Sequence, residues 1–437
     1  MDDVLTPYGE AIQALFARTT NATKPGLERT LALLAMMGSP HQSLRAIHVA
    51  GTNGKGSVVA TCEALLRGQG CRVGRYTSPH LIDFRERITI DGIPIPEEDV
   101  LTFLERWTPA AEKMGATFFE ITTALAFSWF VEQRVDIAVI ETGLGGRLDS
   151  TNVLTPLVAV VTSIAEDHTD LLGSTLPEIA GEKAGIFKEG IPAVIGEPRG
   201  EIQNLLARLA QERKASPVIV VDEVYSLDNV ELSMAGTTFT LIRAGEQSEI
   251  KTPLIGRHQA RNTTIAIAAL DALGEKKRVK LRSISADVAK LNLPGRFERR
   301  GSLIFEHCAS FIFDVAHNPA GARTVAETLS SIETASPRVA VVAVLADKDW
   351  REMIRALSTS VDRFIFTNAP SAPPERLWDP ALANEFARDR GFVSELEPDL
   401  GAALSRAERY GGTVVVTGSF HTVGDAMSCL QVSPFAA

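Results

Sequence analysis

A glycine-rich segment between a strand pattern and a helix pattern could bind phosphate. The apolar run Ile47–Ala50 predicts a strand and Val58–Arg67 predicts a helix. Glycines let backbone N–H groups turn toward an anion, and the following helix N-terminus adds a favourable dipole. The loop consists of Gly51, Thr52, Asn53, Gly54, Lys55, Gly56 and Ser57. A solvated lysine in a plain turn is the competing interpretation. The strand–loop–helix context favours phosphate binding, although the strict Walker pattern is not met.

Acidic and imidazole side chains follow two further predicted strands. Glu141 ends the strand Asp136–Glu141, and Asp167 and His168 come soon after the strand Val158–Ser163. Ligands of open α/β sheets gather at the carboxyl ends of the strands. A carboxylate that faces a phosphate loop there is well placed to hold Mg²⁺. The alternatives are a helix N-cap or an ion pair for Glu141 and a structural role for His168.

Lys183 lies on a helix that follows a capping box, in which Thr175 is the cap and Glu178 stands three residues later. The residues around Lys183 give it no distinguishing feature. From its sequence context alone, we predict a solvated surface lysine.

The elements that must position these residues alternate between strands and helices. The pattern predicts an α/β protein with an open, mostly parallel sheet covered by helices, including one at Ile121–Val131. A further buried strand is predicted at Val218–Val221. Residues 223–253 alternate polar and apolar and predict a small antiparallel appendage, which a helix at Ala260–Leu273 follows.

A Pro-Gly pair at 294–295 interrupts the regular pattern and suits a hinge. We therefore predict an N-terminal P-loop-type ATPase domain (1–293), a linker (294–298) and a smaller Rossmann-like α/β domain (299–437). The strands predicted in this last domain are Leu303–Glu306, Phe311–Asp314, Val339–Leu345, Phe364–Thr367 and Thr413–Thr417.

Composition restricts the class of protein. The 437 residues are 45% hydrophobic and 22% charged, which is enough apolar mass to fold. Because 44 basic residues face 54 acidic ones, the net charge of −10 argues against nucleic-acid and membrane partners. The longest apolar run, Val339–Ala346, is too short to span a bilayer. The acidic start lacks the features of a signal peptide, and the four cysteines form no C-x-x-C pair, so we expect a cytoplasmic protein.

A set of motifs in fixed order is similar to a known family. Beyond the phosphate loop and the segments around Glu141 and His168, the chain carries further matching motifs. They are Tyr76–Leu81, Glu182–Gly185, His258 through Asn262, Pro294–Phe297, Asp314–Pro319 and Gly418–Thr422. The set resembles the folylpolyglutamate synthase/dihydrofolate synthase branch of the Mur ligase superfamily, in its bacterial bifunctional form. The resemblance extends from about residue 20 to 430.

The resemblance implies an ATP-dependent amide ligase. A carboxylate of dihydropteroate or of a reduced folate would be activated as an acyl phosphate, which the amine of L-glutamate then attacks. The implied cofactors are ATP and Mg²⁺, with a role for K⁺ also allowed, and the implied partners are these small molecules. We expect a monomer that binds neither nucleic acid nor membranes.

The resemblance also implies roles for individual residues. The loop Gly51–Ser57 would cradle the ATP phosphates, and Lys183 would be carbamylated and act with Glu141 and His168 in catalysis. The implied metal ligands are Ser78, Glu141 and His168. The implied ATP contacts outside the loop are Asn262, Arg296, Asp314 and His317. Substrate contacts are implied for Ser78, Pro79, His80 and Leu81 on the pterin side and, for glutamate, Lys348, Ser419 and His421.

Other functions stay open at the level of sequence. The chain could be a folylpolyglutamate synthase without the dihydrofolate synthase activity. It could also be a nucleotide-binding switch, although Ala346–Asp349 lacks the asparagine of a guanine-specific motif. A metabolite kinase is a third option, and it would leave phosphate on its product instead of releasing it.

Overall fold

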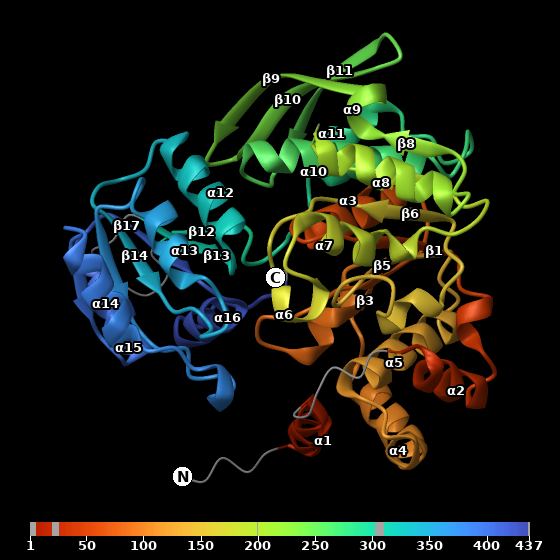
Figure 1. Ribbon diagram of the computed structural model, residues 1–437, viewed down its shortest axis with the longest axis horizontal. Helices are drawn as coiled ribbons and strands as arrows, with labels where there is room; N and C mark the ends of the chain where they lie inside the picture. The colour runs from red at the N-terminus through yellow and green to blue at the C-terminus, as the bar shows by residue number, and fades with distance from the viewer. Residues whose placement is uncertain (1–5, 20–25, 199, 302–309, 436–437) are drawn as a thin grey trace.

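An eight-stranded sheet underlies the N-terminal lobe of the computed structural model (Figure 1), which describes residues 6–19, 26–198, 200–301 and 310–435. Strands β2, β5, β1, β6, β7 and β8 lie side by side in this order, and each runs parallel to its neighbours in that series. Strands β3 and β4 extend the sheet beyond β2 as an antiparallel edge. The strands in order across the sheet are β4 (Ile93–Pro94), β3 (Ile88–Ile90), β2 (Val73–Tyr76), β5 (Ile137–Glu141), β1 (Ala46–Ala50), β6 (Val158–Val161), β7 (Ala193–Ile195) and β8 (Val218–Val220). The predicted open, mostly parallel sheet is confirmed.

Helices cover both faces of this sheet, since the central strands are buried on both sides and are apolar throughout. One face packs against α3 (Lys55–Gly68), α10 (Arg257–Asp271) and α11 (Ile284–Val288). The opposite face packs against α2 (Glu28–Met36), α4 (Glu97–Met114), α5 (Phe118–Glu132), α7 (Leu176–Lys183) and α8 (Glu201–Glu212). Helix α1 (Pro7–Phe16) joins this second group, and α6 (Thr169–Leu172) and α9 (Val221–Val224) are single turns.

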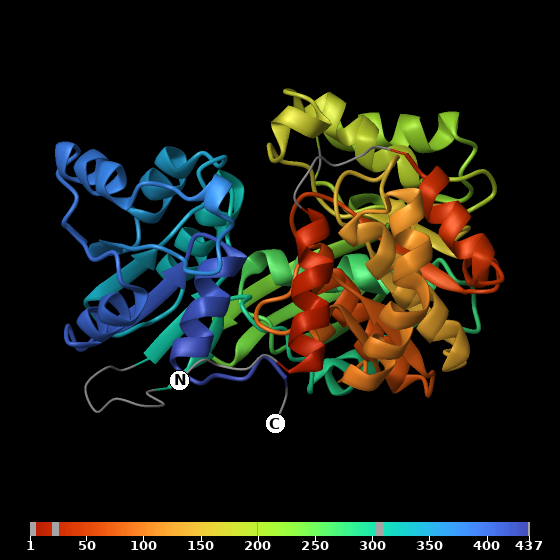
Figure 2. The same cartoon turned by 90° about the horizontal axis from the view of Figure 1, so that it is seen from below.

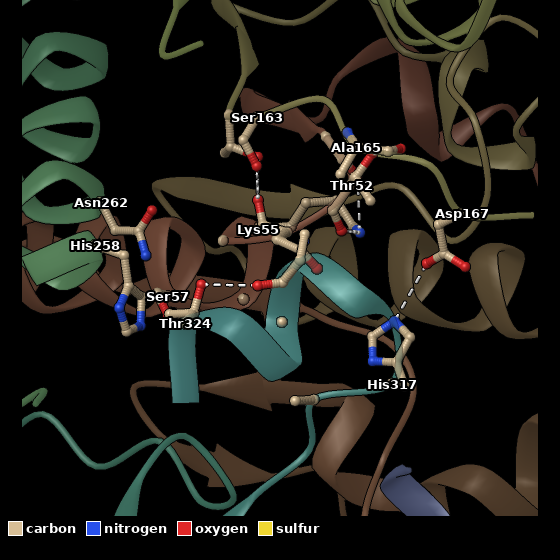
Figure 3. Close-up of a pocket in the computed structure, with 18 of the residues that line it drawn as sticks. Thr52, Lys55, Ser57, Ser163, Ala165, Asp167, His258, Asn262, His317 and Thr324 are labelled. Atoms are coloured by element: carbon tan, nitrogen blue, oxygen red, sulfur yellow. Dashed lines mark hydrogen bonds and ion pairs between the residues drawn. The ribbon is translucent and has the colours of Figure 1, made fainter. Parts of the chain in front are cut away.

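The predicted antiparallel appendage forms a separate three-stranded sheet. It consists of β9 (Tyr225–Ser233), β10 (Gly236–Arg243) and β11 (Glu246–Thr252). Side chains along β10 alternate in burial, so that Phe239 and Leu241 join the same core as α3 and α10. The appendage thereby fixes α10, which runs past the end of the phosphate loop (Figure 3).

A second, six-stranded sheet forms the C-terminal lobe. Its strands in order are β12 (Glu298–Arg300), β13 (Ser310–Asp314), β17 (Thr413–Thr417), β14 (Arg338–Val342), β15 (Arg363–Phe366) and β16 (Ser394–Leu396). Only the edge strand β12 is antiparallel to its neighbour. One face carries α12 (Pro319–Ser330), α13 (Trp350–Leu357) and α14 (Pro380–Asp389), and the other carries α15 (Leu400–Glu408) and α16 (Phe420–Cys429).

Two strand predictions for this lobe need comment. The predicted strand Leu303–Glu306 lies outside the described residues. The predicted strand Val339–Leu345 is too long, because β14 ends at Val342. The apolar residues that follow stay buried as a loop, in which Leu345 makes an isolated bridge to Leu377.

The two lobes lie side by side (Figure 2). Leu81 packs against one core cluster of the C-terminal lobe, and Leu232 and Met234, around the turn between β9 and β10, pack against the other. Within the described ranges, no helix has both the length and the apolar character needed to cross a membrane.

Close packing between β2 and α5 generates a stability prediction. A methyl group at Gly74 would lie 2.8 Å from the ring of Phe130, so Gly74→Ala forces the buried ring to move. We expect overpacking to lower the free energy of unfolding by about 1–3 kcal/mol. Thermal unfolding followed by circular dichroism measures the effect. The matched control is Gly181→Ala on α7, where nothing lies within 4 Å of the added methyl; an equal loss in both variants contradicts the packing argument.

Candidate active site

A cavity of about 410 Å³ lies between the lobes, at the carboxyl ends of β1, β5 and β6. Residues of the C-terminal lobe close its other side. The predicted site residues that line it are Gly51, Thr52, Asn53, Gly54, Lys55, Gly56, Ser57, Ser78, Pro79, Glu141, His168, Lys183, Asn262, Arg296, Asp314 and His317. Residues that are up to 266 positions apart in the sequence therefore share one cavity.

The loop after β1 adopts a conformation that only glycine tolerates at two positions. Gly51 has a φ of +149°, and a Cβ there would lie 1.9 Å from Oγ1 of Thr162. Gly54 has a φ of +86°, and a Cβ there would lie 2.6 Å from Oδ1 of Asn262. The Thr162 and Ser163 hydroxyls donate to the carbonyl of Asn53 at 2.7 and 3.0 Å (Figure 3). The end of β6 thus holds the loop in place, with α3 beginning at Lys55.

Two lysine ammonium groups meet at one carbonyl oxygen. Lys55 Nζ donates to the carbonyls of Gly51 and Thr52 at 3.0 and 3.2 Å, and Lys183 Nζ donates to the same Gly51 oxygen at 3.1 Å. Burial, with the charge of Lys55 beside it, lowers the pKa of Lys183 to about 7. Like charges in a dehydrated cavity favour an anion between them.

The predicted capping box of α7 is confirmed, but the prediction that Lys183 is solvated is wrong. Only 5% of Lys183 is exposed. The last turn of α7 packs on the loop after β5, where a Cβ at Gly146 would lie 2.8 Å from the carbonyl of Lys183. This contact turns the end of the helix into the cavity, and a local helix pattern carries no signal for it.

Glu141 is a buried carboxylate at the end of β5. Its Oε1 lies 3.8 Å from Lys55 Nζ, and the backbone N–H of Ser78 donates to it. A Cβ at Gly56 would lie 3.8 Å from Glu141 Oε2 and 3.7 Å from Arg296 Nη2, so both side chains lie beside the first turn of α3. Burial raises the pKa of Glu141, although Lys55 and Arg296 favour its charged form.

The linker and the C-terminal lobe supply the opposite wall of the cavity. The partly buried Arg296 guanidinium lies 5.0 Å from the centre of the Phe420 ring, a cation–π distance. Asp314 accepts hydrogen bonds from the backbone N–H groups of Phe297 and Ala316 at 2.8 and 2.9 Å. These bonds fix the carboxylate where β13 ends, and burial raises the pKa of Asp314.

The residues present fit a magnesium ion that arrives with a triphosphate. Within the part of the chain that the structure describes, no group of three or more His, Cys, Asp or Glu side chains could hold a metal alone. Mg²⁺ commonly uses one or two carboxylates and takes its other oxygens from phosphates and water. Glu141 and the Ser78 hydroxyl can serve in this way. Burial lowers the pKa of His168 to about 4, which keeps its imidazole in the neutral form that binds metals.

Five predicted substrate contacts do not line this cavity: His80, Leu81, Lys348, Ser419 and His421. Arg87 Nε donates to His80 Nδ1 at 2.7 Å, Leu81 packs on the core of the C-terminal lobe, and Lys348 pairs with Asp167. The buried Ser419 caps α16 by accepting from Thr422 N at 3.0 Å, and His421 Nδ1 lies 3.0 Å from Ser371 Oγ.

Sequence analysis missed other residues of the site. The amides of Asn318 and Asn53 exchange hydrogen bonds at 3.1 and 3.4 Å between the lobes. Asp149 accepts the backbone N–H groups of Gly143 and Leu144 at 2.9 and 2.8 Å and so shapes the loop after Glu141. Both residues lie inside motifs that the sequence singled out, and the Asn-Pro pair at 318–319, where Asn318 is the N-cap of α12, was the available signal for Asn318.

Comparison with known proteins decides the family. The Mur ligase middle domain matches residues 49–270, and the Mur ligase glutamate ligase domain matches residues 295–420. The dihydrofolate synthase/folylpolyglutamate synthase of Bacillus subtilis is 36% identical over 98% of this chain and all of the relative. The chain belongs to the Mur ligase family, in this folate branch. The predicted resemblance is therefore confirmed.

Solved structures of the folate branch share the whole fold. The folylpolyglutamate synthase of Mycobacterium tuberculosis complexed with ADP has a TM-score of 0.89 at 33% identity, covering 98% of this chain and 99% of that one. A bifunctional folylpolyglutamate synthase/dihydrofolate synthase with Mn, AMPPNP and L-glutamate bound has a TM-score of 0.83 at 30% identity, covering 96% and 98%. The predicted fold class is confirmed across both lobes.

Lys55 is part of the phosphate loop, and this position predicts that the enzyme needs it for turnover. Lys55→Ala removes a positive charge of the loop itself, so turnover should fall roughly 100-fold or more while the fold stays intact. Steady-state kinetics measures the loss, and circular dichroism checks the fold. Lys214→Ala, on an exposed lysine paired with Glu189, is the control and should keep full turnover. Turnover within a few-fold of the unaltered protein in Lys55→Ala removes Lys55 from the mechanism.

Proposed function

We propose that this chain joins L-glutamate to dihydropteroate and to reduced folates in an ATP-dependent reaction, with release of ADP and phosphate. The observation that carries the proposal is the convergence of the phosphate loop, Glu141 and two lysines on one cavity that the second lobe closes. The complexes of the relatives with ADP, AMPPNP and glutamate support the same reaction for this chain.

The chemistry needs a better leaving group than a carboxylate offers. One oxygen of the folate carboxylate attacks the γ-phosphorus, the bond to the β-phosphate oxygen breaks, and an acyl phosphate and ADP result. The glutamate nitrogen then attacks the acyl carbon, phosphate leaves, and the nitrogen gives up its proton. Phosphoryl transfer between anions depends mainly on positioning and charge neutralisation. Lys55 and Arg296 both supply positive charge near Glu141 and the start of α3.

Magnesium, when bound with the triphosphate, would neutralise part of the phosphate charge. Ser78, Glu141 and His168 are the residues that we propose to hold it. On the nucleotide side, we propose that Asn262, Arg296, Asp314 and His317 contact ATP, since all four line the cavity beyond the loop. The substrate-contact roles of His80, Leu81, Lys348, Ser419 and His421 stay predictions.

We further propose the domain division that the sequence suggested, with residues 1–293 and 299–437 joined by a hinge at 294–298. The division is supported by the two separate sheets, and the second sheet begins at Glu298. Water hydrolyses an acyl phosphate, so closure of one lobe on the other protects the intermediate. The proposed monomer holds a complete cavity within one chain.

Carbamylation of Lys183 is the modification that the cavity supports best. The neutral amine is the form that attacks CO₂, forming an N–C bond and losing a proton to leave a carbamate anion. A pKa of about 7 leaves a large part of Lys183 neutral near pH 7.5, whereas an ordinary lysine is almost fully charged. The product would replace the repulsion between Lys183 and Lys55 by attraction, since both now meet at Gly51 O.

Product analysis tests the ligase function. The purified protein is incubated with ATP, Mg²⁺ and L-glutamate, and either dihydropteroate or tetrahydrofolate is offered. We expect mass spectrometry to detect one added glutamate on dihydropteroate and one or more on tetrahydrofolate. Product from tetrahydrofolate alone would support the monofunctional alternative. Nucleotide hydrolysis that prefers GTP and ignores glutamate, with no amide product, would support a switch protein and exclude a ligase.

Isotopic labelling tests the carbamate. We expect ¹³C-bicarbonate to give a carbamate carbon signal by NMR that disappears in Lys183→Arg. Because the pKa of Lys183 is about 7, the neutral amine becomes scarce below that value, so labelling should fall as the pH drops from 8 to 6. Lys188→Arg is the control, on a partly buried lysine that donates to backbone carbonyls elsewhere. An unchanged signal in Lys183→Arg contradicts the assignment.

A further inference from the structure

The carboxylate of Asp167 extends from the N-terminal lobe to the C-terminal lobe. Asp167 follows β6, and its Oδ2 lies 3.3 Å from His317 Nε2 (Figure 3). Lys348 Nζ forms a short ion pair with Oδ1, and Asn318 Nδ2 donates to Oδ2 at 3.3 Å. The carboxylate therefore has three partners on the opposite lobe.

These partners belong to two separate loops of the C-terminal sheet. His317 and Asn318 stand between β13 and α12, whereas Lys348 stands between β14 and α13. Strand β17 lies between β13 and β14, so the two loops are not adjacent at the edge of the sheet. One carboxylate thus fixes both loops at once. Asn318 also exchanges hydrogen bonds with Asn53 of the phosphate loop, which ties the same contact to the nucleotide site.

Burial makes this contact specific. The side chains of Asp167 and Lys348 are each 7% exposed. Among the described residues, the two ion pairs that join residues before 294 to residues after 298 both end at Asp167. Loss of Asp167 leaves the Lys348 ammonium nearly buried without this counter-ion, and loss of Lys348 leaves the carboxylate with His317 and Asn318 alone among these partners. Either change costs more than the loss of a surface pair. The apolar contact through Leu81 has no comparable directional requirement.

We propose that Asp167 is the positioning residue for lobe closure, and that it acts through Lys348. When the lobes meet, the carboxylate draws the loops of Lys348 and His317 onto the edge of the cavity that holds the phosphate loop. The inference rests on the proposed ligase function, in which closure protects the acyl phosphate. It gives Lys348 a role different from the predicted contact with glutamate, because its ammonium is occupied by Asp167 in the closed arrangement.

A double-mutant cycle with an independent structural readout tests the inference. The variants are Asp167→Asn, Lys348→Met and the combination, and the matched control is Glu189→Gln, which breaks an exposed ion pair within the N-terminal lobe. We expect each single variant to lose roughly 10- to 100-fold in kcat/KM, and the combination to lose no more than either, because both remove one shared contact. Asp167→Glu keeps the charge and should recover part of the activity.

The structural readout is the radius of gyration by small-angle X-ray scattering with AMPPNP and Mg²⁺. We expect Asp167→Asn and Lys348→Met to be more extended than the unaltered protein and Glu189→Gln to match it. This measurement needs no turnover, so it tests closure even if no amide product forms, which would instead count against the proposed function. If a variant unfolds, as judged by circular dichroism, Asp167→Glu provides the scattering comparison.

Two results overturn the inference. Additive losses in the double variant would mean that Asp167 and Lys348 act separately. A rise in the KM for glutamate in Lys348→Met alone, with compact scattering in both single variants, would make Lys348 a glutamate ligand and remove Asp167 from closure.

Discussion

Positive charges crowded into one cavity between the lobes are the constraint on which the rest of the structure depends. Lys55 and Lys183 share the Gly51 carbonyl, and the partly buried Arg296 approaches from the linker. Glu141 offsets only part of this charge. A nucleotide triphosphate supplies the missing negative charge, and magnesium neutralises the part of the phosphate charge that the side chains leave unbalanced. Binding energy and catalysis thus come from the same groups, since the charges that hold the phosphates also stabilise the transferring phosphoryl group.

The folding of two parallel sheets explains how these groups come together. Each sheet presents the carboxyl ends of its strands to the same cavity, with β1, β5 and β6 on one side and β13 and β17 on the other. Such edges collect loops that are free to carry polar residues. A single lobe would leave the cavity open to water, and closure requires contacts that are strong only in one orientation. Buried polar contacts between the two lobes meet that requirement better than apolar contacts do.

The sequence was sufficient for features that depend on local patterns. The phosphate loop and Glu141 were predictable, because glycines, a lysine and an acid stood directly after buried strands. Lys183 was not, since its burial arises from packing of α7 on the loop at Gly146, which no local pattern encodes. The strands β2 and β7 were not predicted, and in β2 the apolar run is interrupted by Gly74 and Arg75. The hydroxyl of Ser419 also has a structural role that the motif did not indicate, because it caps α16.

The most direct test of the account is a crystal structure with AMPPNP and Mg²⁺. The account predicts that the β- and γ-phosphates lie against the backbone N–H groups of residues 51–57, with Lys55 on the phosphates and the metal next to Glu141. A nucleotide bound outside the cavity between the lobes, or phosphates that contact neither Lys55 nor Glu141, would contradict it.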